Sequence, residues 1–182
     1  MVDFAMWRRL DTPGHDAAIL TRNDGGWSLR GMAVFKHEAG PACINYAVEL
    51  DRSWGTISGD LRGFLAGRPI EHVIRRDNDG WYLNGTMVAG LQHLVDLDYG
   101  FTPATNMQLL RRISLNTGQR MDVSVVWFDI DATTLTELPQ RYERRDEASY
   151  WYKSPTGGYE GVLQVSENGF ARTYPDLWVM EI

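Results

Sequence analysis

The sequence has few lysines and almost no cysteine. Lys36 and Lys153 are its two lysines, so 16 of the 18 basic residues are arginine, and Cys43 is the single cysteine. A lone cysteine excludes a disulfide framework within the chain and a cysteine metal cluster. No segment approaches the roughly 20 apolar residues that a membrane-spanning helix needs. We therefore expect no integral membrane segment.

Positive charge is also in the minority. The 182 residues carry 18 basic and 24 acidic side chains, a net charge of −6. This balance argues against non-specific attraction to a phosphate backbone, so nucleic acid is not an expected partner. The stretch Met1–Arg9 has an acid where a signal peptide has its basic region, and no apolar run follows it. We expect a soluble, cytoplasmic protein.

Long helical patterns are missing, and short strand patterns take their place. Turn signals such as Asn23-Asp24-Gly25-Gly26 and Asn84-Gly85 separate apolar segments at regular intervals. The best helix candidate is short, 104–113, where Thr105 or Asn106 could cap the first turn. The glycines around 54–61 suggest a bulge or bend in a strand. The predicted strands are 5–11, 16–22, 27–37, 43–51, 56–65, 70–76, 80–84, 120–130, 140–145, 148–154, 159–166 and 169–174.

No linker or shift in composition divides the chain. Many short strands with glycine-rich turns predict one mainly β domain over residues 1–182. The expected architecture is a roll, barrel or sandwich with at most one or two short helices.

Motifs for catalysis and metal binding have little support. Asp129-Ile130-Asp131 after an apolar strand resembles the nucleophile motif of haloacid-dehalogenase-type enzymes, but that fold needs βαβ units and further acidic ligands downstream. The four histidines lack the spacing of zinc ligands. We therefore expect no metal, no cofactor and no enzyme activity. The alternative is a hydrolase-type enzyme on a sugar or lipid ester that uses the carboxylate pair Asp96 and Asp98, or Asp129 and Asp131.

The most informative segment runs from Asp96 to Ile113. It combines two carboxylates, a Thr-Pro loop with Asn106, and the adjacent arginines Arg111 and Arg112. Arginine offers planar, bidentate donors to carboxylates, phosphates and vicinal hydroxyls. If 110–115 were a strand, the two arginines would point to opposite faces, and the inward one would need a partner. That partner is either Asp96 or Asp98 in an ion pair, or a ligand.

Most of the tyrosines lie near the carboxyl end of the chain. Tyr150 and Tyr152 share one face of a predicted strand, and Tyr142, Tyr159 and Tyr174 lie on neighbouring strands. Concave surfaces lined by phenols suit amphipathic ligands because each ring is apolar and carries one polar tip. Any single one of these side chains is more often an ordinary core residue than part of a binding surface.

These motifs together resemble a bacterial family of glycolipid-binding proteins over nearly the whole chain. The core of the resemblance is Asp96-x-Asp98 followed by Thr102-Pro103-x-Thr105-Asn106 and Arg111-Arg112-Ile113. The outer motifs are Trp7-Arg8-Arg9-Leu10-Asp11, Tyr46-Ala47-Val48-Glu49-Leu50-Asp51, Trp54, Gly80-Trp81-Tyr82-Leu83-Asn84-Gly85, Gln140-Arg141-Tyr142, Tyr150-Trp151-Tyr152, Gly169 and Tyr174-Pro175-Asp176-Leu177-Trp178. The chain has Leu109 near a place where the family pattern has proline, which favours the short helix.

The resemblance implies a mostly antiparallel, spiral β-roll that binds a lipid or glycolipid-like small molecule without catalysis. We expect aromatic side chains to line a groove for the acyl part, and Arg111, with Asn106 and Asp98, to bind the polar head. A third possibility is a structural module that forms a homodimer through an apolar patch or a strand edge. The candidate ligand-binding residues are Asp96, Asp98, Thr102, Thr105, Asn106, Arg111, Arg112, Trp127, Tyr142, Tyr152 and Tyr174.

Overall fold

A computed structural model of the chain describes residues 2–182; Met1, the first residue of the expected domain, lies outside the described residues. The elements are β1 (Val2–Arg9), β2 (Gly14–Arg22), β3 (Gly26–His37), β4 (Gly40–Asp51), β5 (Thr56–Leu65), β6 (Arg68–Arg76), β7 (Trp81–Leu83), β8 (Thr86–Val88), β9 (Leu97–Tyr99), α1 (Asn106–Ile113), β10 (Arg120–Phe128), β11 (Thr136–Arg144), β12 (Ser149–Ser154), β13 (Tyr159–Val165), β14 (Ala171–Tyr174) and β15 (Trp178–Met180).

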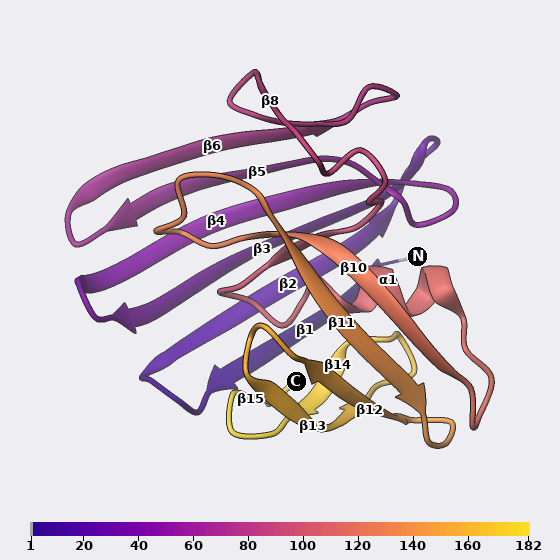
Figure 1. Cartoon of the computed structure of the whole chain (residues 1–182). Coiled ribbons are helices and arrows are strands. Elements are labelled where there is room, and N and C mark those ends of the chain that lie inside the picture. The colour runs from indigo at the N-terminus through magenta and orange to yellow at the C-terminus, as the bar shows by residue number, and fades with distance from the viewer. Residues whose placement is uncertain (1) are drawn as a thin grey trace.

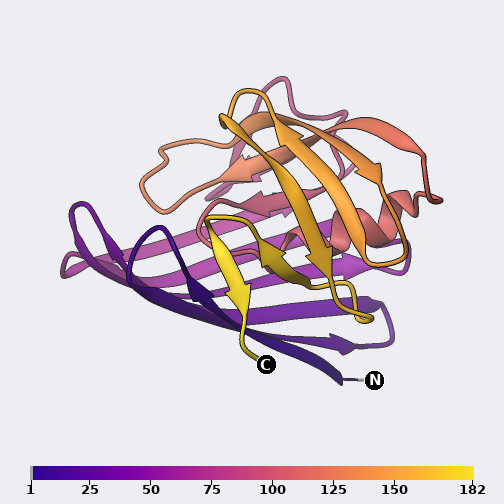
Figure 2. The same ribbon diagram turned by 90° about the horizontal axis from the view of Figure 1, so that it is seen from below.

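All strands belong to one continuous sheet, in the order β8-β7-β6-β5-β4-β3-β2-β1-β15-β14-β13-β12-β11-β10-β9. Neighbours are antiparallel except β9 and β10, which are parallel. Strand β1 pairs with both β2 and β15, so the first and last strands of the chain join the two halves of the sheet. The second half folds back over the first, as Figures 1 and 2 show. The mainly β roll predicted from the sequence is confirmed.

The hydrophobic core fills the space between the two halves of the sheet. Helix α1 lies between these layers at one end of the molecule (Figure 2). Its buried residues include Met107, Leu109 and Leu110. Trp7 and Trp81 are fully buried, and their indole N–H groups donate hydrogen bonds to backbone carbonyls. Because α1 occupies the interior, the loop before it also lies inside the roll. This helix is not long and apolar enough to cross a membrane, and it is the single helix of residues 2–182.

Local sequence signals explain the turns of the sheet. Asn84 and Gly85 both have positive φ, 51° and 81°, as a tight two-residue hairpin turn requires. The register of β4 and β5 shifts near Glu49, which confirms the irregularity predicted for this stretch. Within β5, Gly59 leaves room for the hydroxyl group of Tyr99, which a Cβ at this position would meet. Strand β9, which carries Tyr99, can therefore lie directly on β5 in the other half of the sheet.

Every strand predicted from the sequence overlaps an observed strand. The prediction missed β8, β9 and β15, which have three residues each and are too short to show a periodic pattern. The short helix predicted at 104–113 is present as α1, with Thr105 at its N-cap position. The predicted side-chain cap is absent, however. The hydroxyl of Thr105 donates to Asp98 instead, at 2.6 Å, so tertiary contact replaces local capping.

Candidate functional site

A cavity of about 410 Å³ opens between the loop that precedes α1 and the carboxyl-terminal strands. Such a volume lies in the range of small-molecule sites. The residues around it are Asp98, Tyr99, Gly100, Thr102, Pro103, Asn106, Trp127, Thr136, Glu137, Leu138, Tyr152, Ser154, Thr156, Gly157, Tyr159, Tyr174, Leu177 and Trp178. Aromatic rings and a few polar groups therefore make its wall. Within residues 2–182, no arginine, lysine or histidine lines this cavity.

Asp98 is one of two carboxylates that line the cavity. Its Oδ1 accepts a hydrogen bond from the hydroxyl of Thr105 at 2.6 Å, and its Oδ2 accepts one from Nε2 of Gln140 at 2.9 Å. Burial raises the pKa of Asp98 to about 6, although both hydrogen bonds act in the opposite direction. The carboxylate is thus held in one orientation and carries a charge at neutral pH.

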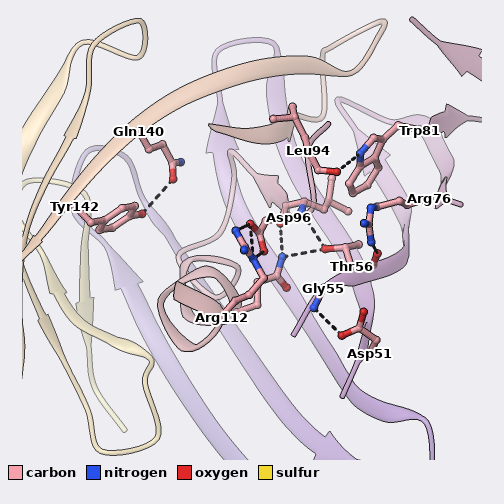
Figure 3. A network of polar contacts seen from close by, with 12 residues as sticks. Asp51, Gly55, Thr56, Arg76, Trp81, Leu94, Asp96, Arg112, Gln140 and Tyr142 are labelled. Carbon is pink, nitrogen blue, oxygen red and sulfur yellow. Dashed lines mark hydrogen bonds and ion pairs between the residues drawn. The ribbon is translucent and has the colours of Figure 1, made fainter. Parts of the chain in front are cut away.

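A chain of polar side chains continues behind the cavity from Asp98. Gln140, which donates to Asp98, accepts a hydrogen bond from the hydroxyl of Tyr142 through its Oε1 at 3.3 Å (Figure 3). Tyr142 in turn accepts one from Nδ2 of Asn106 at 3.1 Å. The side-chain oxygen of Asn106 accepts no hydrogen bond from residues 2–182. Asn106 is therefore fixed by its nitrogen and can offer its oxygen to a ligand.

Tyrosine rings form the apolar part of the wall. Tyr152 packs on Tyr142 with ring centroids 4.8 Å apart, and on Tyr159 and Tyr174 with centroids 5.8 Å apart. Burial raises the pKa values of Tyr152 and Tyr159 to about 12. The phenols remain neutral at physiological pH. They therefore present apolar faces with uncharged hydroxyl tips.

Thr102 connects the cavity wall to a buried acid on the large sheet. Its hydroxyl donates to the carboxylate of Asp16, which also accepts hydrogen bonds from the hydroxyl of Tyr46 at 3.0 and 3.1 Å. Asp16 is 1% exposed, and burial raises its pKa to about 7. Because the loop that carries Thr102 is bonded to strand β2 in this way, one side of the cavity is fixed to the sheet.

Asp96 and Arg112 form an ion pair outside the cavity. Nε of Arg112 lies 2.9 Å from Oδ1 of Asp96, and its Nη2 lies 2.6 Å from Oδ2 (Figure 3). Asp96 is 1% exposed, while Arg112 is partly exposed. The structure thus confirms the ion pair that the sequence analysis gave as one of two possibilities. Asp96 precedes β9 and does not line the cavity, whereas Asp98 lies within β9 and does.

Arg111 points away from the cavity as well. Residues 106–113 are helical rather than extended, so the two arginines are separated by a helical rotation instead of by opposite strand faces. Nη2 of Arg111 donates to the carbonyl of Asn168 at 2.6 Å, and the guanidinium lies 4.8 Å from the ring of Trp54. Neither arginine lines this cavity, although Arg111 was expected to bind the head group there.

The other carboxylate pair does not form a site either. Asp129 accepts a hydrogen bond from the backbone N–H of Ile130 at 2.7 Å. Asp131 is 59% exposed, and its Oδ2 lies 3.8 Å from His37. Within the part of the chain that the structure describes, no three His, Cys, Asp or Glu side chains meet in a way that could hold a metal ion.

The structure thus sorts the predicted site residues into two groups. It brings to the cavity wall Asp98, Thr102, Asn106, Trp127, Tyr152 and Tyr174. Thr105 and Tyr142 stand directly behind that wall, and Asp96, Arg111 and Arg112 lie elsewhere. Glu137 and Trp178 also line the cavity but were not among the residues predicted from the sequence. Trp178 belongs to the last resemblance motif, whereas Glu137 carries no signal of its own in the sequence.

Comparisons with known proteins agree with this architecture. A family model described as "Putative glycolipid-binding" matches residues 4–179. A crystal structure of a DUF1089 family protein from Pseudomonas aeruginosa superposes with a TM-score of 0.78. It is 23% identical in sequence, and the match covers 90% of this chain and 91% of that chain. No curated protein matches the sequence.

Proposed function

Because the chain belongs to the family described as putative glycolipid-binding, we propose that it binds a neutral, hydroxyl-rich amphipathic molecule of the glycolipid type in the cavity beside α1. The binding is non-enzymatic. The observation that carries the proposal is the pairing of a fixed carboxylate, Asp98, with an aromatic wall in one cavity.

The polar groups of the cavity suit a sugar. A sugar hydroxyl can donate to Asp98 and to the free side-chain oxygen of Asn106, and hydrogen bonds to a charged acceptor are stronger than neutral ones. Because Thr105 and Gln140 already hold Asp98, its carboxylate does not have to be reoriented when a ligand binds. The apolar C–H faces of the ligand can pack on the rings of Trp127 and Tyr152.

The charges of the cavity favour an uncharged head group. Asp98 and Glu137 both line it, and within residues 2–182 no cationic side chain does. A phosphate or sulfate in this cavity would be repelled by the two carboxylates without a cationic side chain to compensate. This repulsion weakens the binding of an anionic ligand. The carboxylates thus select a neutral glycolipid over an anionic phospholipid.

The proposal predicts selective binding of a neutral sugar detergent. Octyl glucoside and octyl sulfate have the same chain but different head groups, so titration calorimetry below their micellar concentrations compares the heads directly. We expect octyl glucoside to bind and octyl sulfate to bind at least tenfold more weakly. Asp98→Asn should weaken octyl glucoside binding by roughly tenfold to a hundredfold, since a hydrogen bond to a charged group contributes about 1.5–3 kcal/mol.

Asp131→Asn is the matched control, because Asp131 is a solvent-exposed carboxylate outside the cavity. It should leave binding unchanged, and thermal unfolding verifies that both variants are folded. Equal binding of the two detergents, or equal binding by wild type and Asp98→Asn, contradicts the proposal.

A further inference from the structure

A second cleft lies at the turns β2–β3 and β4–β5, away from the cavity beside α1. Its volume is about 740 Å³. The two turns are neighbours because β2, β3, β4 and β5 are consecutive in the sheet. The cleft is lined by Arg22, Asn23, Asp24, Gly26, Trp27, Arg52 and Trp54, and it shares none of these with the first cavity.

Two tryptophans stack on each other at this cleft, and an arginine lies over the ring of each one. Trp27 and Trp54 stack with ring centroids 4.4 Å apart and an interplanar angle of 18°. The guanidinium of Arg22 lies 5.7 Å from the ring of Trp27, and that of Arg111 lies 4.8 Å from the ring of Trp54. A guanidinium held over a ring keeps its N–H groups directed outward in its own plane. Packing on Trp27 therefore orients Arg22 and leaves its N–H groups available to a ligand.

The backbone is strained where it presents Trp54. This residue has φ of 70°, a conformation that bulky side chains rarely adopt. Asp51 holds the turn, since its Oδ1 accepts hydrogen bonds from the backbone N–H groups of Ser53 at 2.7 Å and Gly55 at 3.0 Å. Strain of this kind persists where surrounding contacts enforce it, and it is common at ligand sites.

The cleft is rich in unused hydrogen-bond donors. Within residues 2–182, Arg22 has no ion pair and donates no hydrogen bond, and the indole N–H groups of Trp27 and Trp54 have no acceptor. Arg52 donates from Nη2 to the carbonyl of Asp24 at 2.8 Å, which joins the two turns and leaves its other N–H groups available. Donors from both turns therefore face one space.

We propose that this cleft is a second binding site, which takes a phosphate-type oxyanion between the guanidinium groups of Arg22 and Arg52. The planar guanidinium group of arginine can donate paired hydrogen bonds to two oxygens of such an anion, and the indole N–H groups of the tryptophans are additional, uncharged donors. The carboxylate of Asp24 also lines the cleft and opposes the anion. The site is independent of the glycolipid cavity, and its ligand is anionic where that of the cavity is neutral.

Inorganic phosphate is the simplest probe of the site. Titration of the full chain followed by the indole N–H signals in ¹H–¹⁵N NMR spectra should shift the signals of Trp27 and Trp54 and saturate. The double variant Arg22→Gln, Arg52→Gln should weaken phosphate binding at least tenfold. Asp24→Asn should strengthen it severalfold, because it removes the opposing charge and leaves the backbone carbonyl that Arg52 holds.

Arg75→Gln is the control, since Arg75 is exposed on β6 and does not line the cleft. Absence of saturable binding overturns the proposal, as does an equal loss in Arg75→Gln, which would show only general charge attraction.

Vesicles distinguish the source of the oxyanion. Co-sedimentation with phosphatidylglycerol but not phosphatidylcholine vesicles, lost in the double variant, indicates a lipid head group. Binding of phosphate without vesicle binding indicates a free phosphorylated molecule.

Discussion

Replacing Arg112 by alanine is expected to lower the free energy of unfolding by about 3 kcal/mol or more. Asp96 is 1% exposed and receives three short contacts from the guanidinium, so removal of Arg112 leaves a buried carboxylate without its partner. Burial already raises the pKa of Asp96 in the presence of Arg112. For a chain of this size, the loss corresponds to a fall in Tm of roughly 6–12 °C.

Arg141→Ala is the matched control for this prediction. Arg141 pairs with Asp122 at the surface, where both side chains are more than 40% exposed, and such pairs contribute about 0–1 kcal/mol. The double variant Asp96→Asn, Arg112→Ala should be more stable than Arg112→Ala alone, because no buried charge is left unpaired. Denaturant unfolding measures all three. A loss below 1 kcal/mol for Arg112→Ala would show that the pair does not hold the segment in place.

The free energy of unfolding is expected to fall as the pH rises from about 4 to about 7. Asp16 has a pKa of about 7 in the folded protein against 3.8 for the ordinary value, because it is buried. In this window the folded state keeps a proton that the unfolded state has lost, so a higher pH favours unfolding. Asp16 alone accounts for at most about 4 kcal/mol of the change. Asp98, with a pKa of about 6, acts in the same direction.

Asp16→Asn should flatten this dependence and make the variant more stable than the wild type at pH 8. The hydroxyls of Tyr46 and Thr102 can rotate to form hydrogen bonds with the amide of the asparagine. The variant therefore loses little free energy of unfolding at pH 5. Asp122→Asn is the control, because Asp122 is exposed and Arg141 lowers its pKa. Any change in stability from protonation of Asp122 therefore occurs below pH 4, outside the measured range. Guanidinium denaturation at several pH values from 4.5 to 8 measures the slopes. An unchanged slope in Asp16→Asn contradicts the assignment.

The fold could be predicted from the sequence because its signals are local. Alternating apolar residues and turn pairs such as Asn84-Gly85 each specify one strand or one hairpin. Strands β8, β9 and β15 lack such signals because three residues show no period. Their pairing depends on contacts with distant segments, as in the parallel pairing of β9 with β10.

The candidate site was only partly predictable. Asp98, Asn106 and the tyrosines were found because their residue types suit an amphipathic ligand and because their spacing matches a family pattern. The directions of Arg111 and Arg112 were not predictable in this way, since they depend on whether the segment is helical and on where Asp96 and Trp54 lie. The stack of Trp27 on Trp54 joins two turns, and nothing local in either turn indicates the other.

The most direct test of the glycolipid proposal is a crystal structure of the protein with octyl glucoside. We expect the sugar in the cavity beside α1, with a hydroxyl within hydrogen-bond distance of Asp98 and the ring against Trp127 or Tyr152. An empty cavity with octyl glucoside bound elsewhere, or a head group that contacts Arg111 or Arg112 instead of Asp98, would contradict it.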